Sequence, residues 1–152
     1  MFRCGIIRGE TMDDDRIRVV LDTNLFAAAR WNPRSASARI IEACMRGRFR
    51  AYYSEQIRRE MALILRNIRS GADFTAKVRA FLDSAVCVEP PGELESLPYV
   101  EDREDAKFLA CALAADADYL ITSDEHLLRV GNFGRTSIVK PSVFVREAME
   151  QR

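Results

Sequence analysis

Two acidic residues of this chain directly follow apolar runs that are typical of buried strands. Asp22 comes after the run at 17–21, and Asp124 comes after the run at 119–121, separated from it by Thr122 and Ser123. In open sheets of parallel strands, ligands bind beyond the carboxyl ends of the strands. We therefore expect both carboxylates to face one crevice, with the hydroxyl groups beside them.

Two further acids lie on predicted helices, close to the side that faces the core. Glu60 borders the apolar stripe of a helix that Ser54 is expected to cap, and Asp105 lies one turn before Phe108 in a helix at 104–115. Each acid also has a structural alternative. Asp22 and Asp124 could cap helices, Glu60 could pair with a nearby arginine, and Asp105 could form a capping pair with Asp102. Asp102 is also a candidate outer ligand.

The four acids together predict a metal site. Clustered carboxylates disfavour one another's charge unless a cation neutralises them, and oxygen ligands suit Mg²⁺ or Mn²⁺. Such ions polarise phosphoryl groups and activate water, so hydrolysis of RNA or DNA phosphodiesters is the predicted chemistry. Histidine is not required for it, and the single histidine, His126, is expected to be a surface residue.

Composition indicates an ordinary globular protein. The chain has 152 residues, of which 48% are hydrophobic and 30% are charged, with a formal net charge of zero. No apolar run reaches the roughly 20 residues of a membrane span, and the start is unlike a secretory signal, so we expect a cytoplasmic protein. The widely spaced cysteines at positions 4, 44, 87 and 111 are expected to be buried thiols. A basic band at 46–79 beside an acidic band at 83–105 could form a phosphate-holding rim or two solvated faces.

Hydrophobic periodicity and turn residues predict alternating strands and helices. We expect strands at 17–21, 49–53, 85–88, 119–121 and 137–139. We expect helices at 25–30, 35–46, from Ser54 to about 69, 74–82, 104–115, near 124 and from Pro141 to 149. This alternation predicts a parallel sheet covered on both faces. Residues 16–152 are expected to form a single domain, and residues 1–15 a flexible extension whose Met12 could be the true start.

Three segments resemble the motifs of the PIN-domain family. Residues 19–24 read VVLDTN and resemble its first motif, residues 101–112 read EDREDAKFLACA and resemble its third, and residues 117–124 read ADYLITSD and resemble its fourth. Ser54 followed by Glu60 fits the second motif. The match runs in order over nearly the whole chain. Within the family, the chain resembles the VapC-type toxins of toxin–antitoxin pairs.

The resemblance implies a small endoribonuclease with a three-layer α/β/α sandwich and a central, mostly parallel sheet, whose activity depends on Mg²⁺ or Mn²⁺. Asp22, Glu60, Asp105 and Asp124 match the family's four acids, which serve as catalytic residues and metal ligands. Asn24, Asp102, Thr122 and Ser123 match its substrate-contacting and supporting positions. The resemblance also implies an RNA substrate cut to 5′-phosphate and 3′-hydroxyl ends, an antitoxin protein partner and a homodimer. Two residues after the fourth acid, where many relatives carry a further Asp, this chain has His126.

Other interpretations of the pattern compete with the nuclease. A haloacid-dehalogenase-type phosphatase needs a second Asp two residues after the first, where this chain has Asn24. A receiver-type domain needs an Asp at the end of a middle strand, whereas the strand at 85–88 ends in Glu89 before two prolines. A non-catalytic PIN-like module that binds RNA or an antitoxin is the alternative that the carboxylates leave open.

Overall fold

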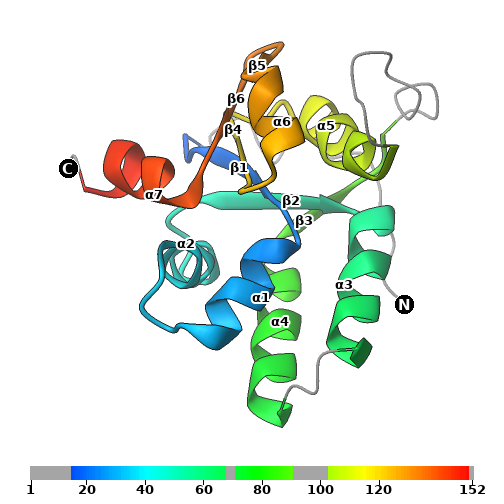
Figure 1. Ribbon diagram of the computed structural model, residues 1–152, viewed down its shortest axis with the longest axis vertical. Helices are drawn as coiled ribbons and strands as arrows, with labels where there is room; N and C mark the ends of the chain where they lie inside the picture. Colours follow the sequence, from blue (N-terminus) through cyan, green and yellow to red (C-terminus); the bar gives the residue numbers. More distant parts are fainter. Residues whose placement is uncertain (1–14, 68–70, 91–102, 151–152) are drawn as a thin grey trace.

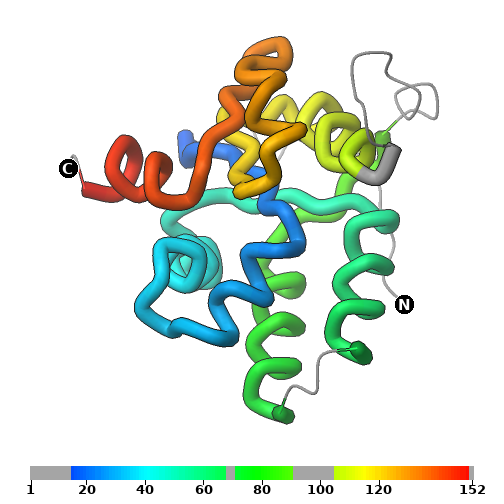
Figure 2. Tube along the Cα trace, viewed as in Figure 1, coloured from blue at the N-terminus to red at the C-terminus, as the bar shows by residue number. Residues whose placement is uncertain are grey.

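The computed structural model describes residues 15–67, 71–90 and 103–150, which build a six-stranded sheet with helices on both sides (Figures 1 and 2). The strands are β1 (Arg18–Leu21), β2 (Arg50–Ser54), β3 (Val86–Val88), β4 (Tyr119–Ile121), β5 (Asn132–Phe133) and β6 (Thr136–Val139). Their order in the sheet is β3-β2-β1-β4-β6-β5, and every neighbouring pair is parallel except β5 with β6. The predicted α/β fold with a central, mostly parallel sheet is confirmed.

The helices cover both faces of this sheet. They are α1 (Asn24–Trp31), α2 (Ala36–Met45), α3 (Glu55–Asn67), α4 (Ala72–Ser84), α5 (Arg103–Ala115), α6 (Glu125–Val130) and α7 (Pro141–Phe144), which continues as a π-helical turn (Val145–Met149). Figure 1 shows α1, α2 and α4 below β2 and α5 above it. Helix α5 packs against β1, β2, β3 and β4, and its residues 105–112 are all buried.

Local signals in the sequence explain where several helices begin and end. The Ser54 hydroxyl accepts a hydrogen bond from the Ile57 amide at 3.3 Å, so it caps α3 as predicted. Gly47 has a φ of +84°, a left-handed conformation that glycine adopts at no steric cost, and it follows the end of α2. Pro141 begins α7, where its missing amide hydrogen is not needed.

All five predicted strands are present, with ends that differ from the prediction by no more than one residue. The strand that sequence analysis missed is β5, which has two residues and forms an antiparallel hairpin with β6. Two residues are too few to show an alternating pattern. Gly134, with a φ of +62°, provides the turn of this hairpin.

The order in which the chain adds strands to the sheet reverses between β1 and β4. The chain proceeds from β1 to β2 and β3 on one side, and then crosses to β4 and β6 on the other. Such a reversal opens a crevice beyond the carboxyl ends of the two central strands, because the connections leave in opposite directions. The register pairs Leu21 with Ile121, and the Asp22 amide donates to the Ile121 carbonyl at 3.0 Å. Asp22 is thereby fixed at this reversal.

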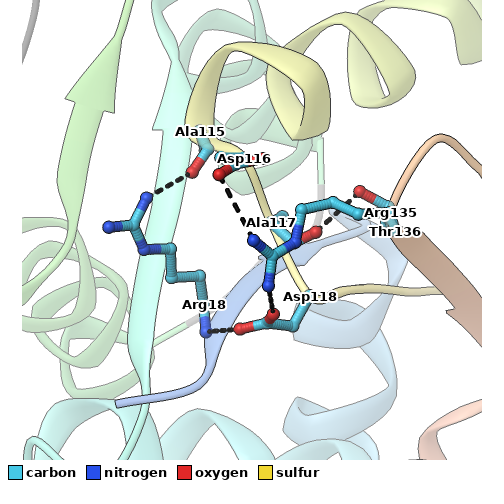
Figure 3. A network of polar contacts seen from close by, with 7 residues as sticks. All are labelled: Arg18, Ala115, Asp116, Ala117, Asp118, Arg135 and Thr136. Atoms are coloured by element: carbon cyan, nitrogen blue, oxygen red, sulfur yellow. Dashed lines mark hydrogen bonds and ion pairs between the residues drawn. The ribbon is translucent and has the colours of Figure 1, made fainter. Parts of the chain in front are cut away.

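A polar network ties β1, β4 and β6 together at the opposite, amino-terminal edge (Figure 3). The Asp118 carboxylate accepts from the Arg18 amide at 2.9 Å and from the Arg135 guanidinium at 2.5 Å. The Arg18 guanidinium donates to the Ala115 carbonyl, and the Thr136 hydroxyl donates to the Ala117 carbonyl. These bonds fix the mutual register of the three strands.

The cysteines and the chain ends complete the comparison with the sequence-based expectations. Cys44 and Cys111 are free and buried as expected, and burial raises the pKa of Cys44 to about 12, but Cys87 is disulfide-bonded, so the expectation of a thiol there is wrong. The predicted extension at 1–15, except Asp15, and most of the predicted loop at 89–99 lie outside the described residues. Within the described ranges, no helix combines the length and apolar character needed to span a membrane.

We predict that Asp118→Asn lowers the free energy of unfolding by roughly 1–3 kcal/mol, because one carboxylate oxygen becomes an amide that faces a donor. Chemical denaturation measures this change. Asp83→Asn is the matched control, since Asp83 is exposed in the last turn of α4 and its replacement removes the same charge outside the network. Equal stability of the two variants would contradict a stabilising role for the network.

Candidate functional site

Asp22 lies at the centre of the crevice with only 3% of its surface exposed. One carboxylate oxygen accepts from the Asn24 amide at 3.0 Å, and the other accepts from the Thr122 hydroxyl at 2.6 Å. The Thr122 oxygen also accepts from the Asp124 amide at 2.9 Å. Because its single hydrogen points to Asp22 while its lone pair receives the Asp124 amide, Thr122 joins the ends of β1 and β4.

Asp124 caps α6, which is the structural alternative that sequence analysis gave for it, and it also lies beside another predicted acid. Its Oδ1 accepts from the His126 amide at 2.7 Å, which caps α6. The same side chain lies beside Asp105, a residue of α5 that is 5% exposed. One ligand atom from each of Asp105, Asp124 and His126 lies within 4.8 Å of the others. The structure therefore brings the third and fourth predicted acids together.

Glu60, on α3, contacts residues close in the chain to two of the other predicted acids. Its Oε1 accepts from the Thr23 hydroxyl at 3.1 Å and lies 3.6 Å from the ammonium group of Lys107. The Lys107 side chain is 3% exposed, whereas that of Glu60 is 31% exposed. Glu60 is thus held at the border of the site by one hydroxyl and one buried cation.

Sequence analysis missed Lys107 and Thr23. Lys107 interrupts the apolar run of α5 two residues after Asp105, and a lysine within a fully buried segment is a signal that could have revealed it. Thr23 offers no such signal, because its hydroxyl matters only through its hydrogen bond to Glu60, a residue 37 positions away on α3. His126, expected at the surface, is half exposed, yet its Nδ1 lies 3.4 Å from Asp124 Oδ1.

The remaining predicted positions are less closely associated with the acids. The Asn24 side chain is exposed, and the backbone amide of Asn24 is the group that donates to Asp22. Ser123 is exposed, while Thr122 is fully buried, so Thr122 is the hydroxyl that contacts an acid. Asp102 lies outside the described residues.

Four of the eight basic residues that the structure describes in the band at 46–79 form exposed ion pairs. Arg58 and Arg59 pair with Glu55 in the same helix, and Arg46 and Lys77 pair with Glu42. Exposed pairs of this kind contribute little to stability. Their presence favours two solvated faces over a phosphate-holding rim.

Burial raises the pKa of Asp22 above its ordinary value. Desolvation is the largest cause, and the negative charge of Asp124 adds to it. Hydrogen bonds from Asn24 and Thr122 and the positive charge of Lys107 act in the opposite direction but do not cancel it. The ionised carboxylate is therefore poorly compensated by the protein alone, which suits a site that completes its charge with a cation.

The donor set agrees with a divalent ion. Carboxylate oxygens of Asp105, on α5, and of Asp124, in the β4–α6 connection, lie close together with one imidazole. Asp22 is not a member of this close group, but Thr122 links it to Asp124. Oxygen donors with additional water are the usual ligands of Mg²⁺, and Mn²⁺ also accepts imidazole. Asp105 and Asp124 are the acids whose oxygens lie close enough to share such an ion, and Asp22 is connected to them through Thr122.

Comparison with known proteins agrees with this geometry. The family model for the PIN domain matches residues 18–126. The chain belongs to the PIN-domain family. The match includes β1, Glu60, the acids of α5 and the β4–α6 connection, so this PIN domain contains every predicted acid. A comparison with curated proteins finds no match.

Solved structures share the fold of this PIN domain at low identity. VapBC2 from Rickettsia felis, in a structure bound to a DNA fragment from its promoter, matches with a TM-score of 0.56 and 14% identity over 82% of this chain and 98% of that one. PAE2754 from Pyrobaculum aerophilum matches with a TM-score of 0.54 and 16% identity over 86% of this chain and 93% of that one. At these identities the similarity supports the fold alone.

We predict that Asp22→Asn stabilises the metal-free protein relative to the wild type as the pH rises. A carboxyl whose pKa is raised on folding binds its proton more tightly in the folded state, so the wild type loses stability above the ordinary value of 3.8. The variant lacks this loss. Urea denaturation in chelator between about pH 4 and pH 7 measures the difference, which should grow with pH.

Asp83→Asn is the control for this comparison, because Asp83 is exposed in the last turn of α4 and its loss removes the same charge. A difference between wild type and Asp22→Asn that stays constant over this pH range would contradict the unfavourable ionisation of Asp22.

Proposed function

We propose that this PIN domain is a metal-dependent endoribonuclease that hydrolyses RNA phosphodiester bonds and acts in the cytoplasm as the toxin of a toxin–antitoxin pair. The observation that carries the proposal is the close group of Asp105, Asp124 and His126, to which Thr122 links Asp22 at the end of β1. Membership of a family of nucleases supports the same chemistry. Mg²⁺ or Mn²⁺ is the proposed cofactor.

Each residue has a definite role in this proposal. Asp22, Glu60, Asp105 and Asp124 hold the metal and form the catalytic set. When bound, the ion polarises the phosphoryl group and lowers the pKa of a water molecule. Thr122 keeps the Asp22 carboxylate in one orientation, so this ligand needs no reordering when substrate binds. Asn24, Asp102 and Ser123 are proposed to contact the RNA around this centre.

Lys107 and Thr23 are proposed to position Glu60. Both contact the same oxygen, Oε1, so the other carboxylate oxygen can turn toward the ion or an attacking water. The Lys107 ammonium also offsets part of the negative charge near Asp22. The protein thereby keeps several acids in one crevice before any metal arrives.

A toxin role further implies a protein partner. The solved VapBC2 structure, which shares this fold, holds a DNA fragment from its promoter. We propose that an antitoxin protein binds the present chain. We also propose that the chain forms a homodimer. The competing function is a PIN-like module that binds RNA or an antitoxin without cutting. Metal-dependent turnover separates the two.

We predict that purified protein cuts a mixed RNA sample in the presence of Mg²⁺ or Mn²⁺ and that chelator abolishes cutting. Asp22→Asn and Asp124→Asn should each lower the rate by on the order of 10²-fold or more, because each removes a charged ligand around which the reaction is organised. Gel analysis of end-labelled RNA, with mapping of the new termini, measures both rate and product chemistry.

Asp83→Asn is again the matched control and should cut at the wild-type rate. Equal cutting by Asp22→Asn and wild type would identify a contaminating nuclease and remove Asp22 from the site. Absence of cutting by protein that binds metal and RNA, and is free of any antitoxin, would favour the binding module.

We predict that Lys107→Met makes folding depend more strongly on divalent ions. Removal of a buried cation leaves neighbouring carboxylates uncompensated, so the melting temperature in chelator should fall, and added Mn²⁺ should raise it by more than in the wild type. Cleavage should fall by roughly 10²-fold through displacement of Glu60. Lys77→Met, which removes a half-exposed lysine, is the control. An unchanged response to Mn²⁺ would argue against Lys107 as a charge-compensating residue.

A further inference from the structure

His126 stands at the solvent-exposed side of the proposed metal site. Its Nδ1 lies 3.4 Å from Asp124 Oδ1, and its ring offers a ligand atom within 4.8 Å of those of Asp105 and Asp124. The side chain is 48% exposed, whereas Asp105 is 5% exposed. The imidazole therefore borders the open side of the site, and Asp105 forms its buried wall.

The backbone holds His126 in this place. Asp124 caps α6, and its Oδ1 accepts from the His126 amide at 2.7 Å. This hydrogen bond keeps the His126 ring within one helical turn of Asp124. Two carboxylates and one imidazole from separate elements, α5 and the start of α6, are thus brought together without rearrangement of the backbone.

An imidazole changes which ions a site prefers. Carboxylates and water suit Mg²⁺, which is reluctant to exchange oxygen for nitrogen, whereas first-row transition ions accept imidazole readily and bind nitrogen more strongly along the series from Mn²⁺ to Co²⁺. The same two acids with a third carboxylate would favour Mg²⁺. The identity of residue 126 can therefore decide between these ions.

We propose that His126 is a direct metal ligand, together with Asp105 and Asp124, and that it makes the site selective for Mn²⁺ and Co²⁺ over Mg²⁺. The inference rests on the metal site of the proposed function and deepens it by naming the class of ion. It assigns the imidazole a role at the metal and none in proton transfer.

Titration calorimetry of the whole, tag-free chain with Mn²⁺, Co²⁺ and Mg²⁺ tests the proposal. In His126→Ala, the affinity for Mn²⁺ and Co²⁺ should fall at least about tenfold, the loss that even an outer hydrogen-bonding partner of a ligand causes, while Mg²⁺ affinity changes little. In His126→Asp, Mg²⁺ affinity should rise relative to Mn²⁺. Unchanged Mn²⁺ and Co²⁺ affinities in His126→Ala would overturn the proposal.

A spectroscopic measurement reports the bond itself. Because the chain contains a single histidine, nitrogen coupling in the pulsed electron paramagnetic resonance spectrum of bound Mn²⁺ can be assigned to one ring. The coupling should be present in the wild type and absent in His126→Ala. Mn²⁺ that is bound without nitrogen coupling in the wild type would exclude His126 as a ligand.

Asp124→Asn separates this inference from the proposed function. If Asp124→Asn abolishes Mn²⁺ binding and His126→Ala leaves it intact, the metal site stands and only the histidine assignment fails. If Asp124→Asn and Asp105→Asn both retain wild-type Mn²⁺ binding, the metal site fails, and the histidine assignment fails with it.

Discussion

The hydrogen bond from Thr122 to Asp22 is the contact on which the arrangement of the site depends. It spans 2.6 Å in a region that water does not reach, and it joins residues one hundred positions apart in the chain. A bond to an ionised acceptor is among the stronger ones available to a protein. Its direction is fixed because the Thr122 oxygen also accepts the Asp124 amide. The parallel pairing of β1 with β4 places Asp22 and Thr122 side by side at the carboxyl ends of these strands. The Asp118 network stabilises the same pairing at their amino-terminal ends.

Charge is the second constraint, and it works against the fold. Asp22 is buried where its ionised form is disfavoured, and Asp124 makes that form less favourable still. Lys107 opposes this effect from within α5, where it replaces what would otherwise be another apolar side chain. The metal-free protein thus tolerates its acids through one buried ammonium and several directed hydrogen bonds. A protein arranged in this way gives up some stability in exchange for a site that is ordered before the proposed cation binds.

The sheet and the acids could be predicted from the sequence because both are marked by the pattern of apolar residues around them. Val19, Val20, Leu120 and Ile121 are nearly or wholly buried, and continuous apolar runs of this kind are the signature of strands in a parallel sheet. Asp22 and Asp124 were found because they follow those runs. The polar groups that orient them were harder to find. Thr23 contacts Glu60, which lies on a separate element, α3, and the position of His126 beside Asp105 depends on how α6 leaves the sheet. Pairings across separate elements have no period in the sequence.

The cap of α6 gives the site an additional mechanical property. Asp124 uses Oδ1 to hold the first turn of a helix that has only six residues, and a helix this short has little stability of its own. The order of residues 125–130 therefore depends on the same Asp124 carboxylate that lies beside Asp105 in the site. We therefore expect a change in what that carboxylate binds to alter the local unfolding of α6, and hydrogen exchange of residues 125–130 would report that change.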